Sequence, residues 1–166
     1  MRGQIITSYG RAYVVELENG EILKCSTRGK KTHFVCGDWV QLQRSNQEQG
    51  VIESFSTRSS LLYRSDAFRS KMIAANVSQV IIVCAAEPAF SEAFLQRCLC
   101  ACESENIHIL IILNKMDLPS SRLLLAQLSP YISMGYAVLP LAGIADCAPL
   151  LPYLDNQTSL LIGQSG

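Results

Sequence analysis

The segment Asn114-Lys115-Met116-Asp117 has the residue types and spacing of a base-recognition site. It directly follows the apolar run of residues 109–113, which is typical of a strand buried on both faces. An ionised Asp accepts hydrogen bonds at two oxygens and donates none, so Asp117 can take two parallel donors. Guanine offers such a pair, its ring N–H and its exocyclic amino group, whereas adenine presents an acceptor at the ring position. A site of this kind rejects the wrong base by about 10⁴-fold or more, because its polar groups would be left unpaired.

A second segment, Gly163-Gln164-Ser165-Gly166, indicates phosphate binding. It follows an expected strand and matches the start of G-x-x-x-x-G-K-[ST], the loop whose backbone N–H groups hold nucleotide phosphates. A strand that ends in Gly and Ser is common by itself, so the segment gains its meaning from the N-K-x-D segment. The alternative for N-K-x-D is a surface turn in which the Asp caps a following helix.

The second half of the chain alternates between the periodicities of strands and helices. Apolar β-branched runs predict buried strands, and apolar side chains at helical spacing predict helices. The strands are expected at residues 77–86, 107–113, 136–141 and 159–162, and the helices at residues 91–105 and 121–133. This alternation predicts a parallel sheet with right-handed crossovers. Ligands bind beyond the carboxyl ends of such strands, which is where both segments are expected to lie.

The first half predicts a small barrel. Asn19-Gly20 between two apolar stretches is a strong hairpin signal, since both residues tolerate positive φ. Five short strands in about 55 residues predict an OB-like closed barrel, and an SH3-like barrel gives nearly the same pattern. The expected strands are residues 4–9, 12–17, 21–26, 38–44 and 50–55. The expected domains are a barrel at 1–57, a basic interdomain arm rich in Ser and Arg at 58–75, and an α/β domain at 76–166.

Composition and charge exclude several classes of protein. The 166 residues are 49% hydrophobic and 17% charged, which is enough apolar material for a packed core and argues against a disordered chain. The apolar runs fall far short of the roughly 18 residues needed to span a bilayer, so we expect no membrane partner. The net charge is zero, but residues 1–75 carry 11 Lys and Arg against seven Asp and Glu, and residues 76–166 carry three against seven. This asymmetry suggests that only the first part meets a polyanion, although ordinary variation between domain surfaces gives the same balance.

The seven cysteines favour a reducing compartment. An odd number without a C-x-x-C pair or a signal peptide argues against a disulfide framework, so we expect a cytoplasmic protein. Cys98 and Cys102 stand four residues apart in an expected helix, but two thiolates without further ligands make a poor zinc site. We expect both to be buried as small apolar residues.

Basic residues of the first half are candidates for contacts with RNA phosphates. The leading candidates are Arg28, Lys30, Lys31, Arg64 and Lys71. The wider set adds Arg11, Lys24, Arg44, Arg58 and Arg69. A solvated loop is the alternative for the stretch from Arg28 onward. The rings of Tyr9, Tyr13, Phe34 and Trp39 can stack on unpaired bases, but we expect most of them in the barrel core.

The order of the two nucleotide segments is unusual. In ordinary GTPases the phosphate loop comes first, whereas here N-K-x-D precedes it. The chain thus resembles a circularly permuted GTPase, specifically the bacterial ribosome small-subunit-dependent GTPase A family. Further segments that resemble this family are Arg28-Gly29-Lys30, Val35-Cys36-Gly37-Asp38-Trp39-Val40, Arg58-Ser59-Ser60-Leu61-Leu62-Tyr63-Arg64 and Lys71-Met72-Ile73-Ala74-Ala75-Asn76-Val77.

The resemblance implies an OB-fold that contacts ribosomal RNA and a permuted GTPase domain that uses GTP or GDP with Mg²⁺. Such proteins assist late maturation of the small ribosomal subunit, which stimulates their GTP hydrolysis, and we expect a monomer. Asn114, Lys115 and Asp117 then read guanine, with the aliphatic stem of Lys115 laid over the base. Leu141-Ala142-Gly143 matches the family's S-A-K, where the backbone N–H of the Ala makes the useful contact and Leu141 departs from Ser. The implied nucleotide-binding set is Asn114, Lys115, Met116, Asp117, Leu141, Ala142, Gly163, Gln164, Ser165 and Gly166.

The sequence departs from the family in what it does not contain. The phosphate-loop Lys and Ser, both switch regions and a zinc-binding C-terminal domain are not among the 166 residues. Those parts place Lys and Mg²⁺ against the β and γ oxygens, so we expect catalytic residues beyond Gly166 and no hydrolysis by these residues alone. Structural Zn²⁺ is expected only in the C-terminal domain. The alternative is a non-catalytic RNA-binding module whose α/β half is a scaffold.

Overall fold

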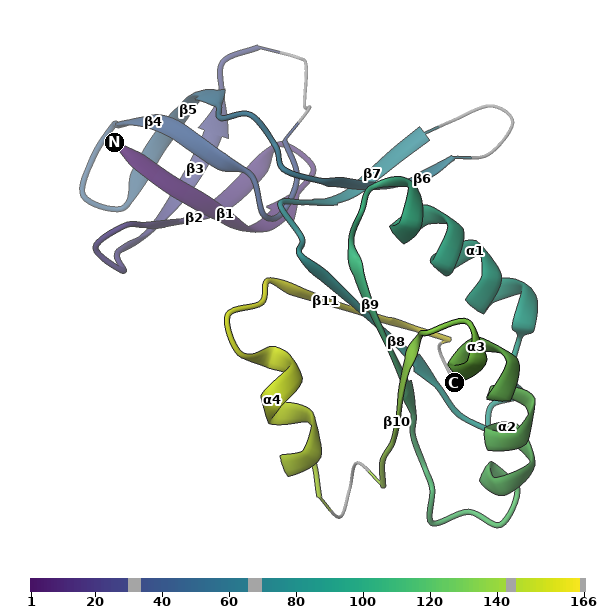
Figure 1. Ribbon diagram of the computed structural model, residues 1–166. Coiled ribbons are helices and arrows are strands. Elements are labelled where there is room, and N and C mark those ends of the chain that lie inside the picture. Colours follow the sequence, from purple (N-terminus) through teal and green to yellow (C-terminus); the bar gives the residue numbers. More distant parts are fainter. Residues whose placement is uncertain (30–33, 66–69, 143–145, 165–166) are drawn as a thin grey trace. The chain divides into compact units, whose positions relative to one another are not determined.

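The computed structural model describes residues 1–29, 34–65, 70–142 and 146–164. The chain divides into two compact units, Met1–Asn76 and Val77–Gly166 (Figure 1). Each unit contains its own sheet structure and its own buried apolar residues. In the described part of the chain, no helix has the length and apolar character needed to cross a membrane.

The first unit contains a closed five-stranded barrel with the strand order β1-β2-β3-β5-β4. Its strands are β1 (Arg2–Tyr9), β2 (Ala12–Leu17), β3 (Ile22–Thr27), β4 (Trp39–Arg44) and β5 (Gln49–Phe55). β1 pairs with both β2 and β4, and a parallel pairing of β3 with β5 completes the circle. A five-stranded Greek-key barrel closed in this way is of OB type, so the predicted OB-like barrel is confirmed and the SH3-like alternative falls.

The barrel interior is filled by alternate residues of each strand. Its buried core consists of Ile5, Tyr13, Val15, Leu17, Leu23, Cys25, Val40, Leu42 and Ile52. Phe34 packs against this core with its ring edge-on to Tyr13, at 5.9 Å between centroids. Trp39 is half-buried beneath the Arg2 guanidinium, and only Tyr9 among the four expected stacking residues is largely exposed. Most of the aromatic residues considered for base stacking are therefore engaged in the barrel.

Residues after the barrel form a hairpin of β6 (Leu61–Ser65) and β7 (Ser70–Ala75) that packs on the barrel. Cys36 forms a β-bridge with Ala74, and the Ala75 N–H donates to the Cys36 carbonyl at 2.9 Å. Gly37 lies beside this contact with φ +91°, and a Cβ there would meet the Ala75 carbonyl oxygen at 1.9 Å. Only glycine fits at this approach of hairpin and barrel.

A buried ion pair also fixes this segment to the barrel. The Arg58 guanidinium donates to both carboxylate oxygens of Asp38, at 2.7 and 2.8 Å. Asp38 is fully buried, and its carboxylate also accepts from the Val35 N–H at 2.9 Å. These hydrogen bonds to Asp38 raise the pKa of Arg58. Arg58, expected among the phosphate contacts, is thus bound within its own unit and is not available to RNA.

The second unit is built on a four-stranded parallel sheet with the order β10-β9-β8-β11. Its elements are β8 (Gln79–Cys84), α1 (Glu92–Ser104), β9 (His108–Leu113), α2 (Ser121–Gln127), α3 (Ser129–Ser133), β10 (Ala137–Pro140), the 3₁₀ turn η1 (Ala148–Leu150), α4 (Leu151–Leu154) and β11 (Ser159–Gly163). The predicted parallel sheet is confirmed. The single helix expected at residues 121–133 is wrong, because the chain breaks there into α2 and α3 with Pro130 in the first turn of α3.

Helices cover both faces of this sheet (Figure 1). On one face, Leu150 and Leu154 of η1 and α4 pack against buried side chains that include Ile81, Leu110 and Ile112. The helices α1, α2 and α3 lie on the other face. With both faces covered, the central strands β8 and β9 are almost wholly buried, as their continuous apolar runs predict.

Candidate functional site

The carboxyl ends of the four parallel strands meet at one edge of the sheet. Asn114 follows β9 at this edge, Leu141 follows β10, and Gly163 is the last residue of β11. The Asn114 N–H donates to the Cys84 carbonyl at the end of β8, at 2.8 Å. The Met116 N–H donates to the Leu141 carbonyl at 3.0 Å, which ties the N-K-x-D loop to the loop after β10. The structure therefore brings these two predicted segments into direct contact.

The order of the strands also places the phosphate segment nearby. Only β8 separates β9, which leads into N-K-x-D, from β11, which leads into the Gly-rich segment. The chain runs from β8 outward to β9 and β10, then returns to the opposite side of β8 as β11. This reversal is a topological switch point, where open α/β sheets form a crevice for ligands.

Lys115 adopts an unusual backbone conformation in the N-K-x-D loop. Its φ is +61°, in the left-handed region that costs a residue with a side chain roughly 1–2 kcal/mol. The Lys115 carbonyl accepts two hydrogen bonds, from the Leu118 N–H at 3.0 Å and from the Ser121 hydroxyl at 2.6 Å. The Lys115 ammonium donates to the Glu87 carbonyl at 2.6 Å. Contacts from three places in the unit thus hold this residue in its strained conformation.

Asp117 presents a carboxylate to solvent at the same edge. Its residue is exposed, and within the described ranges no group donates a hydrogen bond to its side chain. Asn114 and Met116 are half-buried, while Lys115 is exposed like Asp117. Both oxygens of Asp117 are therefore open to donors from a ligand, as base recognition requires.

The loop after β10 begins with Leu141, at the position where the family has Ser. Leu141 is only 5% exposed and belongs to the buried cluster with Ile81, Leu110 and Ile112. Its side chain serves the core, so only its backbone takes part in the edge. Ala142 follows as a half-buried residue, and Gly143 lies outside the described residues.

The end of β11 is closely packed and linked to α1. Gly163 pairs with Val83, and a Cβ on Gly163 would lie 3.0 Å from the Val83 carbonyl oxygen. The Gln164 side-chain oxygen accepts from the Ser91 N–H at 2.9 Å, and Ser91 caps α1 by accepting from the Phe94 N–H. The first two residues of the segment are thus positioned by β8 and α1. Ser165 and Gly166 lie outside the described residues.

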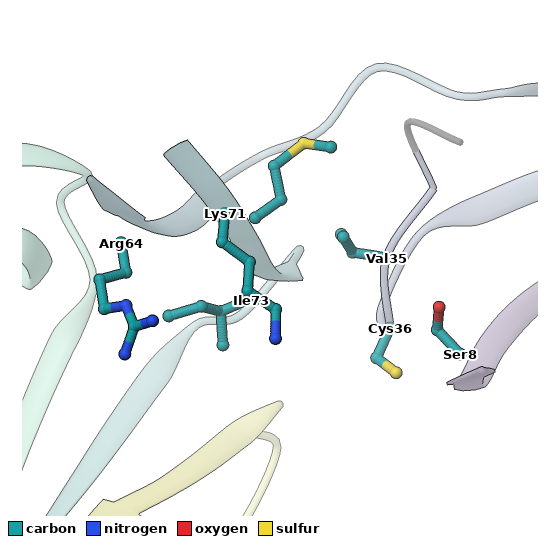
Figure 2. A pocket seen from close by; sticks show the side chains of 7 residues that line it. Ser8, Val35, Cys36, Arg64, Lys71 and Ile73 are labelled. Carbon is teal, nitrogen blue, oxygen red and sulfur yellow. The ribbon is translucent and has the colours of Figure 1, made fainter. Parts of the chain in front are cut away.

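The expected RNA-binding residues lie in the first unit. Arg64 and Lys71 are direct partners in the β6–β7 pairing and line one pocket of about 430 Å³. Figure 2 shows these cations and Ile73 on the hairpin side of the pocket, with Cys36 and Ser8 on the barrel side. Like charges directly opposite on neighbouring strands repel, and neither cation has an acidic partner in the described part of the unit.

Of the other leading RNA candidates, Arg28 lies in the described part of the chain. Arg28 is exposed and donates to the Gln43 side-chain oxygen at 3.3 Å. Lys30 and Lys31 lie outside the described residues.

Sequence reasoning missed Ser121 and Glu87, which contact Lys115 from α2 and from the loop after β8. A Ser at the start of a helix indicates only a helix terminus, and Glu87 lies 28 positions before Lys115. No sequence pattern in the chain marks either residue as a neighbour of N-K-x-D.

Comparisons with known proteins agree with this arrangement. The family model for the RsgA GTPase matches residues 55–166. The chain is 48% identical over 167 residues to the small ribosomal subunit biogenesis GTPase RsgA of Nitrosospira multiformis, covering 100% of this chain and 53% of the relative. It is 45% identical to the protein of the same name from Neisseria meningitidis serogroup C, covering 98% and 53%. The chain therefore spans about half the length of the curated relatives it matches.

Solved structures show the same fold. The crystal structure of YjeQ from Thermotoga maritima matches with a TM-score of 0.75 and 26% identity, over 99% of this chain and 60% of that one. YloQ, described as a circularly permuted GTPase, matches with a TM-score of 0.71 and 28% identity, over 99% and 60%. The order of motifs, the barrel joined to a parallel sheet and the similarity along the whole chain agree, and this chain belongs to the RsgA GTPase family.

Proposed function

We propose that the whole protein binds guanine nucleotides at the carboxyl edge of the parallel sheet and hydrolyses GTP during maturation of the small ribosomal subunit. The relatives named above are described as small ribosomal subunit biogenesis GTPases. The observation that carries the proposal is the Asp117 carboxylate, which is exposed at a topological switch point beside the strained Lys115.

Three residues of the loop have distinct roles in this proposal. Asp117 accepts hydrogen bonds from the ring N–H and the amino group of guanine, which adenine cannot provide. The stem of Lys115 covers the face of the base, and the backbone N–H of Ala142 donates to the base from the neighbouring loop. Asn114 fixes the loop by its N–H bond to β8.

Phosphate binding is proposed at the end of β11. Gly163 allows the backbone to lie close to β8, and Gln164 ties the segment to the start of α1. Mg²⁺ supplies charge neutralisation at the β and γ phosphates when it is bound with GTP. The described residues contain no cluster of three or more His, Cys, Asp or Glu able to hold a metal ion. No complete G-x-x-x-x-G-K-[ST] occurs in the 166 residues.

Hydrolysis by these 166 residues alone is not expected for the same reason. Transfer of the γ-phosphoryl group relies on a phosphate-loop Lys and on Mg²⁺ positioned against the phosphate oxygens. We propose that the catalytic residues and any structural Zn²⁺ belong to other parts of the whole protein, which acts as a monomer in the cytoplasm.

Calorimetric titration of the full-length protein with GDP and ADP tests the nucleotide proposal. We expect GDP to bind and ADP to bind at least about 10³-fold more weakly, because ADP leaves the Asp117 carboxylate facing an acceptor. Equal affinity for the two nucleotides would contradict guanine recognition at this loop.

RNA binding through the first unit is a second part of the proposal. Arg64 and Lys71 face each other across the hairpin and line a pocket, so a phosphate between them would relieve their repulsion. Arg28, Lys30 and Lys31 are further proposed phosphate contacts of the first unit. The contacted partner is the ribosomal RNA of the small subunit.

Salt-dependent binding tests this second part. The double variant Arg64→Ala/Lys71→Ala should reduce the slope of log affinity against log salt for the small subunit by roughly 1.5, as expected for two lost phosphate contacts. The variant Arg97→Ala/Arg122→Ala removes the same charge from helices of the second unit and serves as the control. Equal slopes for the two variants would remove the pocket from the RNA interface.

A further inference from the structure

Ser121 is a buried polar residue next to the base-recognition loop. It is the first residue of α2 and is 0% exposed. Its hydroxyl donates across six positions to the Lys115 carbonyl at 2.6 Å, and its own N–H donates to the Leu118 carbonyl at 3.1 Å. The hydroxyl is therefore directed into the loop and away from solvent.

The partner of this hydroxyl, Lys115, occupies a strained position of the loop. Lys115 has a left-handed backbone with φ +61°, although it carries a long side chain. The other residues with positive φ in the described ranges are Asn or Gly, which tolerate this conformation. A strained residue persists only where its surroundings hold it, and the Ser121 hydrogen bond is the shorter of the two on the Lys115 carbonyl.

The direction of two functional side chains depends on this backbone. A left-handed residue turns the chain sharply, so the side chains before and after it point differently than they would in an extended or helical loop. Lys115 itself and Asp117, two residues later, lie on the turn that the hydroxyl holds. A shift of this backbone would move the Asp117 carboxylate relative to the base.

We propose that Ser121 is a positioning residue for guanine recognition, acting by holding Lys115 in its left-handed conformation so that Asp117 meets both donors of the base. This inference rests on the proposed guanine binding. Ser121 does not itself touch the nucleotide, and its effect is on the selectivity for guanine.

Inosine diphosphate separates a positioning role from a merely structural one. Hypoxanthine keeps the ring N–H of guanine but lacks the exocyclic amino group, so Asp117 makes one hydrogen bond to it in place of two. The ratio of GDP affinity to IDP affinity therefore reports how well the Asp117 carboxylate is aimed. Loss of general stability lowers both affinities by the same factor and leaves the ratio unchanged.

The experiment is calorimetric titration of the full-length protein with GDP and with IDP, for the wild type and three variants, and with ADP for the wild type. In Ser121→Ala, GDP affinity should fall by roughly 3- to 10-fold, as for the loss of one buried hydrogen bond, and the GDP-to-IDP ratio should fall at least about 2-fold. Ser121→Thr keeps the hydroxyl and should restore most of the ratio. Ser133→Ala is the matched control, because the Ser133 hydroxyl also donates to a backbone carbonyl, at 3.1 Å, but in α3.

The outcomes distinguish a failure of the proposed guanine binding from a failure of the role assigned to Ser121. A wild type that binds GDP no more tightly than ADP would overturn the proposed function and this inference with it. A wild type that prefers GDP, with the same GDP-to-IDP ratio in Ser121→Ala as in Ser133→Ala, would overturn the inference alone. A ratio that falls in Ser121→Ala and returns in Ser121→Thr supports it.

Discussion

Replacing Asp117 by Asn tests the chemistry of the candidate site most directly. The change keeps the size of the side chain but replaces one acceptor oxygen by an amide N–H₂ group, which would face the amino group of guanine donor to donor. Asp117 is exposed, and no described residue bonds to its carboxylate, so the substitution breaks no contact within the protein. We therefore expect the stability to be unchanged and the nucleotide preference to change.

The magnitude follows from the hydrogen bond that is lost. Asn keeps one oxygen that accepts from the ring N–H, so the change removes one hydrogen bond to a charged group, which contributes about 1.5–3 kcal/mol, and sets the amide and the guanine amino group donor to donor. The upper end applies because the amino group is then left without an acceptor. A loss of about 3 kcal/mol corresponds to an increase in the Kd for GDP of roughly 100-fold.

Xanthosine diphosphate (XDP) tests for a gain in affinity, which a misfolded variant would not show. Xanthine has a carbonyl where guanine has its amino group, so the carboxamide of Asp117→Asn can donate to it while accepting from the ring N–H. Titration of the full-length protein with GDP and XDP should show the first affinity falling and the second rising. Asp155→Asn, an exposed position beside α4, is the matched control. Unchanged GDP affinity in Asp117→Asn, or an equal loss for both nucleotides, would refute the role assigned to this carboxylate.

Three further predictions concern the framework of the two units. Arg58→Ala should lower the free energy of unfolding of the first unit by about 3 kcal/mol, since it leaves the buried Asp38 carboxylate unpaired, and urea unfolding measures this. Burial raises the pKa of the Cys84 and Cys102 thiols to about 11, so maleimide at pH 8 should modify the exposed Cys100 and Cys147 first. The free energy of unfolding should also fall as the pH rises from 9 towards 11, because only the thiols of the unfolded chain lose their protons in that range. Gly37→Ala should destabilise the first unit by about 2 kcal/mol or more, because the new Cβ meets a carbonyl of β7 at a left-handed position, and thermal melting would show no change if that approach were loose.

Local signals predicted most of the elements, because they depend on neighbours in sequence. Alternating apolar residues mark the barrel strands, and Asn19-Gly20 stands at the turn between β2 and β3, with Gly20 at φ +82°. The order in which the barrel strands pair was beyond such signals. The pairing of β1 with β4 and the parallel pairing of β3 with β5 join distant residues, and several closed barrels share the same strand pattern.

The segment of residues 58–75 shows how composition can hide packing. Its Ser and Arg content indicates an exposed arm, yet its first Arg pairs with a carboxylate 20 positions earlier and its last strand contacts Cys36. An Arg that binds RNA and an Arg that neutralises a buried Asp look the same in a sequence. The difference is the 0% exposure of Asp38, which only the three-dimensional structure reveals.

In the candidate site, the spacing of residues in the sequence predicts which groups are present, and packing determines how they are oriented. N-K-x-D could be predicted because its chemistry requires particular residue types at a fixed spacing after a buried strand. The conformation of the loop could not be predicted in this way, because a left-handed backbone at Lys115 is unfavourable by itself. It is held by Ser121 and by the loop after β8, two segments whose own sequences carry no sign of that role. A motif therefore identifies the groups that touch a ligand, while the residues that aim them are found from the hydrogen bonds around the strained position.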